Sequence, residues 1–520
     1  MQIIIPMSGY GERFRRAGYN MPKPLIRVES KPIIQHVYEM FPGESNFIFI
    51  CNQDHINNDD YELEETITSF CPTAKIVSIQ PHSLGPVHAV LASEDLINDD
   101  EQTIVNYCDF SCYWDYSSFK KYITENNLDG AIPAYRGFHP HTLWSNYYAY
   151  LKIDNNLVTA IQEKTPFTHT PQDEYASSGT YFFKSGKLMK EYFKKCIDLN
   201  LKVNNEFYVS MVYEPMIADG LKVSPFELEH FMQWGTPRDL EDYNYWSDIF
   251  KNYNKNNSDM PGTLLMSMAG SGSRFAVAGY TDIKPLIEVS NKPMAVKAYQ
   301  DLPRAKKNIA VIRNDQKNIE ELILVMQKEF HDISFYNLDI VTDGQAVTCA
   351  RAIEEMNIAN EYLTISACDN GIIYNKNNFE ALMEQDIDII VWAARSYPGA
   401  SRNPNMYGWL QVNVQNEIID VSVKKPFSNP DFDPIIVGTF TFKNPEVFMN
   451  CYKSLKNRKG LVNGEYYVDS MIKDALSLGL NCKVFEIDKY ICWGTPNDLK
   501  TYEYWESCFS KWSSHPFHRT

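Results

Sequence analysis

Short apolar runs alternate along this 520-residue chain with polar segments, some of which have helical spacing. In the first part of the chain, the runs that have the length of buried strands lie at 2–7, 46–51, 75–79 and 103–107. Residues 31–40 and 85–97 have helical spacing, and Pro32 suits the first turn of a helix. Strands that alternate with helices are typical of βαβ units, so we expect an α/β fold whose sheet is mostly parallel.

The next segment has a different pattern, in which two apolar runs flank a turn rich in asparagine. Residues 149–153 and 158–163 therefore predict a β-hairpin, and residues 409–414 and 417–423 repeat the pattern further along. We expect a parallel α/β front half and a mixed back half, each occurring twice.

The chain contains an internal repeat whose period is about half its length. Residues 9–26 recur at 270–287, an offset of 261, and the Trp-Gly-Thr-Pro motif at 234–237 recurs at 493–496, an offset of 259. A period this long is not that of a solenoid and indicates the tandem duplication of a whole domain. We expect one domain at 1–250, a polar linker at 251–261 that includes Pro261, and a second domain at 262–515.

Composition narrows the class of protein. The formal net charge of −17 disfavours nucleic acid as a partner, because binding its backbone requires a basic surface. The eleven cysteines form no CxxC pair, so we expect free, buried thiols rather than zinc ligands or disulfides. The chain starts directly with a strand and has no long apolar segment, so we expect a cytoplasmic protein that does not cross a membrane.

The loop after the first strand has the features of a phosphate site. Glycines let backbone N–H groups approach a ligand, and Arg13 and Lys23 supply positive charge. The residues of this loop that we expect to contact a nucleotide are Met7, Ser8, Gly9 and Gly11. Their partners in the second copy are Gly270 and Gly272, together with the cations Arg274 and Lys284.

An aspartate follows the strand at 103–107. Ligands of open α/β sheets bind beyond the carboxyl ends of strands, so Asp109 is placed to hold a metal ion. A single aspartate there is often only a turn residue, but its recurrence as Asp369 favours the metal role. Mg²⁺ is the expected ion, because it combines one or two carboxylates with substrate phosphates and water.

Later matched positions add candidates for ligand binding. Gly85 and, in the second copy, Gly344-Gln345 each open an expected helix. For both, a nucleotide contact and a plain helix start are equally good interpretations. Lys164 recurs as Lys424 and is a candidate to hold a second phosphate. The remaining candidates for substrate binding are Glu163, Gly179, Glu206, Gly438 and Glu465.

Taken in order, these motifs resemble those of the sugar-phosphate nucleotidylyltransferases, also called nucleoside-diphosphate-sugar pyrophosphorylases. The resemblance implies a Rossmann-like, GT-A-like fold and the reaction NTP + R-phosphate → NDP-R + pyrophosphate. It also implies that Arg13 holds the departing phosphates, Lys23 the α-phosphate region, Lys164 the phosphate of R, and Asp109 Mg²⁺. The expected partners are an NTP and a phosphorylated sugar or alcohol, for surface polysaccharide or glycolipid precursors, in a homo-oligomer or an intramolecular pseudo-dimer.

The sequence departs from the family pattern at several positions. Gln233 and Cys492 stand where similar enzymes often have a second metal-binding aspartate, and Val423 stands in place of Glu163. We therefore expect the first copy to be the catalyst. The alternatives are a bifunctional enzyme with two acceptors, a regulatory second copy, or a glycosyltransferase, which the lack of an Asp-x-Asp motif disfavours.

Overall fold

The computed structural model describes residues 1–252 and 258–519. Contacts between residues divide the chain into two compact units, one of Met1–Ser247 with Ser507–Thr520 and the other of Asp248–Glu506. Helix α9 (Pro237–Asn252) and strand β15 (Asp259–Ser267) take up both ends of the expected linker 251–261, and residues 253–257 of it lie outside the described residues. The sequence repeat had not indicated that Ser507–Thr520 groups with the first unit.

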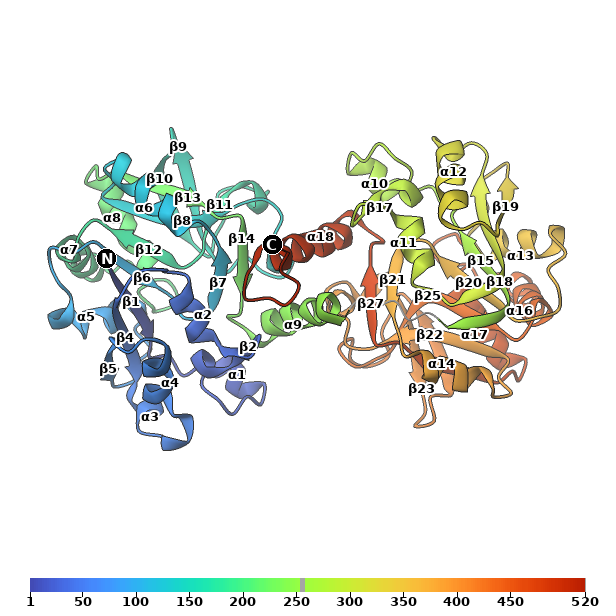
Figure 1. The fold of residues 1–520 in the computed structure, drawn as a ribbon, viewed down its shortest axis with the longest axis horizontal. Coiled ribbons are helices and arrows are strands. Elements are labelled where there is room, and N and C mark those ends of the chain that lie inside the picture. The colour runs from blue at the N-terminus through green and yellow to red at the C-terminus, as the bar shows by residue number, and fades with distance from the viewer. Residues whose placement is uncertain (253–257, 520) are drawn as a thin grey trace. The chain divides into compact units, whose positions relative to one another are not determined.

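The first unit is built on a parallel layer in the order β5-β4-β1-β6. The bounds of these strands are β1 (Gln2–Met7), β4 (Asn46–Asn52), β5 (Lys75–Ile79) and β6 (Thr103–Asn106). The central strand is apolar throughout, and Ile3, Ile4 and Ile5 are completely buried. The strands that the apolar runs predicted are confirmed, and so is the α/β class (Figure 1).

The rest of this sheet is mainly antiparallel. Strand β12 (Thr180–Phe183) pairs antiparallel with β6 and with β8 (Gly130–Tyr135), and β11 (Tyr175–Ser177) joins β8 to β9. Strands β9 (Ala149–Asp154) and β10 (Leu157–Glu163) form the predicted hairpin. Its turn residues Asn155 and Asn156 both have positive φ, as a two-residue hairpin turn requires. Strand β13 (Val223–Glu227) lies parallel to β8, while β7 (Phe110–Tyr113) and β14 (His230–Gln233) form a small separate sheet.

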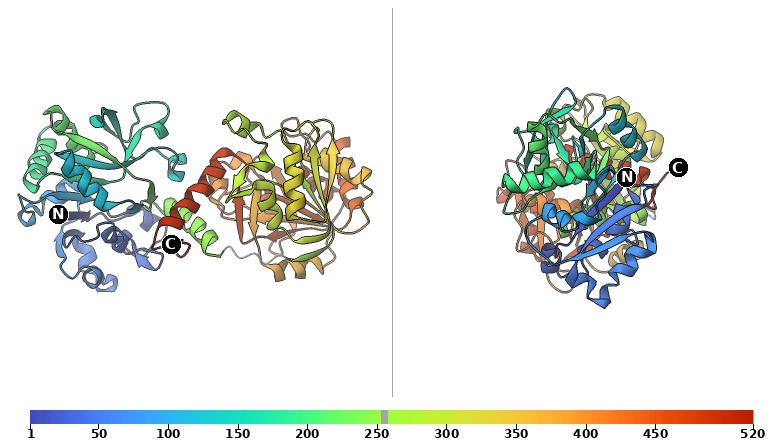
Figure 2. Two further views of the ribbon diagram at one scale, coloured as in Figure 1. Left: turned by 45° about the horizontal axis from the view of Figure 1, so that its top comes forward. Right: turned by 90° about the vertical axis from the view of Figure 1, so that its left-hand side faces the viewer.

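Helices pack against the sheet of the first unit (Figures 1 and 2). They include α2 (Ile33–Glu39), α4 (Leu63–Phe70), α5 (Pro86–Leu91), α6 (Tyr116–Glu125), α7 (Gly186–Asp198) and α8 (Tyr213–Ala218). Two expected helices are shorter than the pattern suggested. Lys31–Pro32 forms strand β3 with β2 (Arg27–Val28), so α2 begins only after the proline, and α5 ends at Leu91, before a short 3-10 turn at Glu94–Leu96.

The second unit repeats this order of strands, which supports the duplication. Its sheet runs β19-β18-β15-β20-β25-β22-β26, and β23 and β24 form the hairpin. The strand bounds are β18 (Arg304–Arg313), β19 (Ile333–Leu338), β20 (Leu363–Ala367), β22 (Ile389–Ala394), β23 (Gly408–Val412), β24 (Ile418–Val423), β25 (Ile435–Phe442) and β26 (Cys482–Glu486). Its helices include α11 (Met294–Gln300), α12 (Ile319–Glu329), α13 (Gln345–Glu355), α16 (Pro445–Asn457), α17 (Val468–Ser477) and α18 (Pro496–Lys511).

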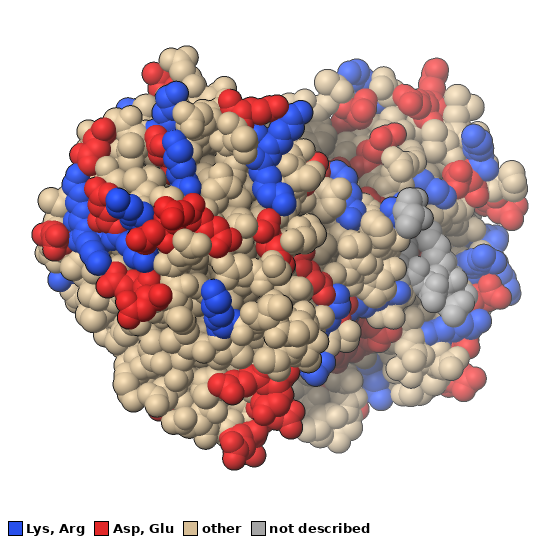
Figure 3. Space-filling model, turned by 60° about the vertical axis from the view of Figure 1, so that its left-hand side comes forward, with Lys and Arg blue, Asp and Glu red and all other residues tan. Residues whose placement is uncertain are grey.

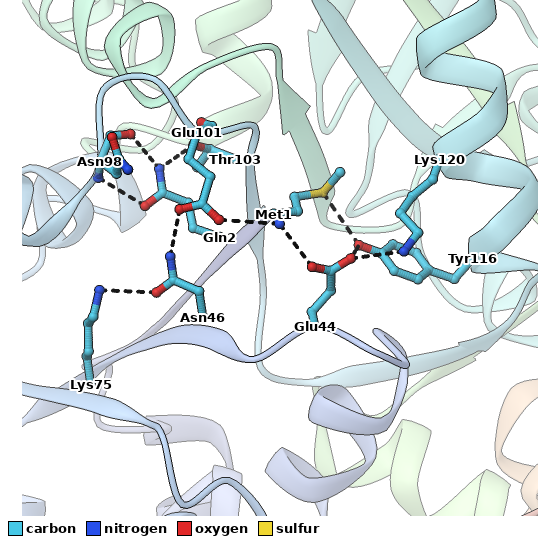
Figure 4. A network of polar contacts seen from close by, with 10 residues as sticks. All are labelled: Met1, Gln2, Glu44, Asn46, Lys75, Asn98, Glu101, Thr103, Tyr116 and Lys120. Carbon is cyan, nitrogen blue, oxygen red and sulfur yellow. Dashed lines mark hydrogen bonds and ion pairs between the residues drawn. The ribbon is translucent and has the colours of Figure 1, made fainter.

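A polar network ties the amino-terminal ends of the parallel strands together (Figure 4). Glu44 accepts hydrogen bonds from the Met1 amino group at 3.0 Å, from Tyr116 at 2.9 Å and from Lys120 at 3.1 Å. Burial alone would raise the pKa of Glu44, but these donors hold it below its ordinary value. Gln2 bonds Thr103 on the neighbouring strand at 2.7 Å. The network fixes the end of the layer that is opposite the glycine loop.

The charged side chains of one face and the cysteines can be compared with the composition. Acidic and basic side chains are interspersed on the face drawn in Figure 3, with no continuous basic stripe on that face. All eleven cysteines are free and buried, as expected. Within the described ranges, no helix has both the length and the apolar character that crossing a bilayer would require.

Candidate functional site

The glycine loop lies at the carboxyl end of β1 and leads into α1 (Glu12–Arg16). Gly11 has φ 66°, and a Cβ there would come within 3.4 Å of the Lys23 Cβ. Glycine therefore allows both the left-handed turn and the close approach of the lysine. A Cβ at Gly9 would meet nothing within 4 Å, so the backbone at this position is open to a ligand.

Lys23 and Asp109 form an ion pair beside this loop. The Lys23 Nζ lies 2.9 Å from the Asp109 Oδ2, and the side chains are 21% and 26% exposed. Burial alone would lower the pKa of Lys23, but Asp109 and Cys108 raise it above the ordinary value. Lys23 therefore stays charged while the pair remains accessible, as a site for an anionic ligand requires.

A cavity of about 350 Å³ brings many of the expected residues together. It lies beyond the carboxyl ends of β1 and β6, the edge where open α/β sheets bind ligands. Its lining includes Met7, Ser8, Gly9, Gly11, Lys23, Gly85, Asp109 and Glu206 from the predicted set. His82, Tyr107 and Tyr208 also line it and were not predicted.

Gly85 brings the segment 206–208 to the cavity. It has φ 93°, and a Cβ there would lie 2.6 Å from the Phe207 backbone nitrogen. The Phe207 N–H donates to the Leu84 carbonyl at 2.9 Å, and the Val87 N–H donates to the Phe207 carbonyl at 3.2 Å. Gly85 thus lines the cavity, but the need for glycine comes from this backbone contact.

Tyr208 links two of the predicted residues. The Lys164 Nζ donates to the Tyr208 hydroxyl at 2.5 Å, and that hydroxyl donates in turn to Glu206. The Lys164 Nζ also lies 4.3 Å from the centroid of the Tyr208 ring. The recurrence of this tyrosine as Tyr467 was a signal that the sequence contained and that we did not use.

Glu163 lies behind this group, on β10. Its Oε2 accepts a hydrogen bond of 2.6 Å from the Ser210 hydroxyl. Burial raises the pKa of Glu163, although Ser210 and Lys164 oppose the shift. The site therefore has two carboxylates beside one ammonium group, an arrangement suited to a ligand that carries both a phosphate and hydroxyl groups.

Four predicted residues of this unit are not in the lining of the cavity: Glu163 and Lys164, described above, and Arg13 and Gly179. Arg13 is exposed, with its guanidinium 5.7 Å from the ring centroid of Tyr147. Gly179 has φ 99°, and a Cβ there would come within 3.1 Å of the Tyr107 and Phe110 side chains. The glycine therefore lets the wall of the cavity pack closely.

Gln233 lies at the position where a second metal-binding aspartate was expected. A Cβ on Gly235 would come within 2.7 Å of the Gln233 Nε2 and 3.1 Å of the Asp109 Oδ2, so both side chains face the same glycine. A carboxylate that the sequence analysis missed, Asp239, lies close enough to be influenced by Asp109. The pKa of Asp239 is raised to about 6, mainly by burial and to a smaller extent by the negative charges of Asp242 and Asp109. Hydrogen bonds from Thr236 oppose this increase.

The C-terminal segment packs behind this part of the first unit. The Trp512 ring centroid lies 5.2 Å from that of His36 and 6.0 Å from that of Trp234. The backbone N–H of Trp234 donates to the Asp109 carbonyl at 3.0 Å. The segment therefore supports the loop that carries Asp109.

The second unit contains a similar arrangement. Lys284 pairs with Asp369 at 2.5 Å and also bonds the Gly494 carbonyl at 3.2 Å. The other predicted residues of this copy lie on matching elements, with Gly270 and Gly272 in the loop, Arg274 on α10 (Ser273–Val277), Gln345 at the start of α13, and Gly438 on β25. A Cβ on Gly344 would lie 2.7 Å from the Tyr466 backbone nitrogen, much as one on Gly85 would lie 2.6 Å from that of Phe207.

Cys492, in the position that matches Gln233, has its sulfur 3.6 Å from the Asp498 Oδ2. Within the described ranges, no group of three or more His, Cys, Asp or Glu side chains could by itself hold a metal ion in either unit. Any ion held by Asp109 would therefore take further ligands from water or from a substrate.

Comparison with known proteins identifies the class. Residues 2–251 match the family model described as nucleotidyl transferase. The bifunctional protein GlmU of Methanocaldococcus jannaschii is 25% identical over 48% of this chain and 51% of its own length. The corresponding protein of Methanococcus maripaludis is 33% identical over 19% of this chain and 23% of its own length. Mannose-1-phosphate guanyltransferase of Yarrowia lipolytica is 26% identical over 26% of this chain and 37% of its own length.

The first copy, residues 2–251, belongs to the nucleotidyl transferase family, as its motifs predicted. The second copy is linked to it by the internal repeat and by the same order of strands. The chain spans about half the length of the first of these relatives and less of the other two.

Proposed function

We propose that the first unit transfers a nucleoside monophosphate from an NTP to a phosphorylated sugar or alcohol and releases pyrophosphate. The observation that carries the proposal is the cavity in which the glycine loop, the Lys23–Asp109 pair and Glu206 meet. Family membership of residues 2–251 supports the reaction class, and the name of the Yarrowia lipolytica relative supports a sugar phosphate as acceptor.

In this reaction an oxygen of the acceptor phosphate attacks the α-phosphorus of the NTP, and pyrophosphate leaves on the opposite side. The protein has to position two anions and neutralise their charge. The backbone at Gly9 and Gly11 is open to the triphosphate, and Lys23 is placed for the α-phosphate. Arg13, exposed beside the loop, is placed for the departing phosphates.

The acceptor binds on the other side of the cavity in this proposal. Lys164, held by Tyr208, meets the acceptor phosphate, while Glu163 and Glu206 accept hydrogen bonds from its hydroxyl groups. Because Tyr208 bonds both Lys164 and Glu206, it keeps the cation and the carboxylate at a fixed separation. This arrangement selects an acceptor in which hydroxyl groups lie near the phosphate.

Asp109 is the residue that would hold a divalent ion, which we propose to be Mg²⁺. The donor fits, because a partly exposed carboxylate at the cavity wall offers the oxygen that Mg²⁺ prefers, and phosphates would supply the remaining ligands. When bound, the ion would neutralise charge on the triphosphate. We also propose a cytoplasmic location and a role in supplying activated precursors for polysaccharide or glycolipid assembly, for which the free thiols and the sugar-phosphate class are the support.

The test is pyrophosphate release by the full chain, with five nucleotides and a panel of phosphorylated sugars and alcohols. We expect Lys23→Ala and Asp109→Asn each to lower kcat/KM by about 10²–10³, the usual cost of removing a group that stabilises transition-state charge. The matched control is Lys184→Ala, which removes an exposed lysine paired with Asp129 at 3.2 Å, near the opposite end of β6. Unchanged activity in the Lys23 and Asp109 variants would refute the proposal.

A further inference from the structure

Three differences between the two copies fall on one spot of the fold. Where the first unit has Glu163, the second has Val423, and where the first has Ser210, the second has Asp469. Ala149, the Cα partner of Glu163 across the hairpin, is matched by Gly408, the Cα partner of Val423. The strand loses a carboxylate, the facing segment gains one, and a methyl group disappears between them.

In the first unit the carboxylate comes from the strand. Glu163 ends β10 and reaches across to accept the hydrogen bond from Ser210, which lies on the 3-10 turn Val209–Val212. Ala149 is buried at 3% exposure, so its methyl group occupies the space beside this pair.

In the second unit the carboxylate comes from the opposite wall. Asp469 lies in the first turn of α17, and a Cβ added to Gly408 would overlap its Oδ2. The Asp469 carboxylate therefore occupies the space where an alanine at 408 would place its methyl group. The missing methyl of Gly408 and the missing carboxylate of Val423 are both explained by a carboxylate that enters from the helix.

The residue types around this carboxylate match those of the first unit, although the Lys424 Nζ donates to the Met406 carbonyl at 3.2 Å, whereas Lys164 donates to Tyr208. Burial raises the pKa of Asp469 to about 6, against the smaller, opposing effect of the positive charge of Lys424. The Lys424 Nζ lies 5.6 Å from the ring centroid of Tyr467, and Tyr467 bonds Glu465. Lysine, tyrosine and glutamate thus recur together, with Asp469 beside the lysine as Glu163 is beside Lys164.

A purely structural role explains only part of this. An aspartate in the first turn of a helix is favourable because the helix dipole attracts negative charge. That attraction, however, does not require a glycine on the neighbouring strand. A glycine inside a strand loses more conformational freedom on folding than an alanine and buries less surface, so the exchange is unfavourable unless the carboxylate is needed at this place.

We propose that Asp469 replaces the Glu163 carboxylate in the second unit and, with Lys424, binds a phosphate ester that carries hydroxyl groups. The second unit then has an acceptor site of its own, in which Asp469 accepts hydrogen bonds from hydroxyls and Lys424 holds the phosphate. The proposal rests on the acceptor class proposed for the first unit.

The test is calorimetric titration of the full chain carrying Lys164→Ala, which weakens the acceptor site of the first unit. The probes are mannose 1-phosphate, glucose 1-phosphate and glycerol 3-phosphate. Every probe is titrated five times, in the presence of the α,β-methylene analogue of one of the five nucleotides at a time. We expect at least one probe to bind, and Asp469→Asn to weaken it about 10- to 100-fold, as loss of a hydrogen bond to a charged group does. Inorganic phosphate, which has no hydroxyl-bearing carbon, should bind as well or better after Asp469→Asn.

The matched variant transplants the arrangement of the first unit. Gly408→Ala, Val423→Glu and Asp469→Ser together should restore binding of that probe to within about fivefold, which also excludes misfolding as the cause of the loss. The proposal is overturned if no probe binds the Lys164→Ala chain, if Asp469→Asn binds within twofold of it, or if the triple variant stays as weak as Asp469→Asn. Pyrophosphate release is measured separately, in the chain that retains Lys164, where Asp469→Asn should leave the Asp109-dependent activity of the first unit unchanged, so the two proposals fail separately.

Discussion

Replacing Gly85 by alanine should disturb both the fold and the acceptor side of the cavity. The residue has φ 93° and ψ 174°, a conformation that is almost restricted to glycine, so strain alone costs about 1–3 kcal/mol. The new Cβ would lie 2.6 Å from the Phe207 nitrogen and 2.7 Å from its oxygen, so that backbone has to move. Weakening the two hydrogen bonds that join the segments adds about 0.5–1.5 kcal/mol each. The expected loss of stability is about 2–6 kcal/mol.

Gly220 provides the matched control. It also has positive φ, at 80°, but a Cβ there meets nothing within 4 Å. Gly220→Ala therefore carries only the backbone cost, about 1–2 kcal/mol. Thermal and urea unfolding of both variants gives the difference.

Kinetics should separate the two variants as well. Because Phe207 lies between Glu206 and Tyr208, Gly85→Ala should raise the KM for the acceptor more than the KM for the NTP, whereas Gly220→Ala should change neither. Equal stability and equal kinetics of the two variants would refute the reasoning that Gly85 positions this segment.

Three further predictions follow from single contacts. Asp469→Asn should raise the melting temperature more at pH 7.5 than at pH 5, and a shift independent of pH would contradict this. The reason is that a carboxyl with a folded pKa near 6 stabilises the fold only while it is protonated, so up to about 3 kcal/mol of stability is lost as the pH rises from 4 through 6. Trp512→Ala should destabilise the first unit by about 3–5 kcal/mol in urea unfolding, because the ring is buried beside His36 and Trp234. A loss under 1 kcal/mol would be inconsistent with that packing. Glu44→Gln should lower stability by about 1–3 kcal/mol at pH 7 and by less at pH 4, because a carboxyl whose pKa is lowered in the folded state stabilises the fold only when the pH is above its pKa in the unfolded state. Equal losses at both pH values would argue against the network of Figure 4.

The sequence alone predicted the strands and the duplication well, because both leave signals that are local or periodic. Apolar runs marked β1, β4, β5 and β6, and the paired asparagines marked the hairpin turn between β9 and β10. The glycine loop, Lys23, Gly85, Asp109 and Glu206 were identified as separate motifs, and the structure brings them to one cavity.

Contacts between segments far apart in the chain could not be predicted from the sequence. Val423 could be read only as the loss of Glu163, since its compensation comes from Asp469, 46 positions further along the chain. The requirement for glycine at 85 comes from the backbone of Phe207, and the support of the site by Trp512 comes from the far end of the chain. These contacts depend on how distant segments meet, which no local pattern encodes.

The most direct test of the central claim follows the α-phosphate of the nucleotide. The full chain is incubated with an α-radiolabelled NTP, a phosphorylated acceptor and Mg²⁺, and the products are separated and counted. Transfer to the acceptor predicts label in NDP-R, one pyrophosphate for each labelled product, and loss of both in Lys23→Ala and Asp109→Asn. Label in free NMP or NDP, or labelled NDP-R formed equally by these two variants, would contradict it.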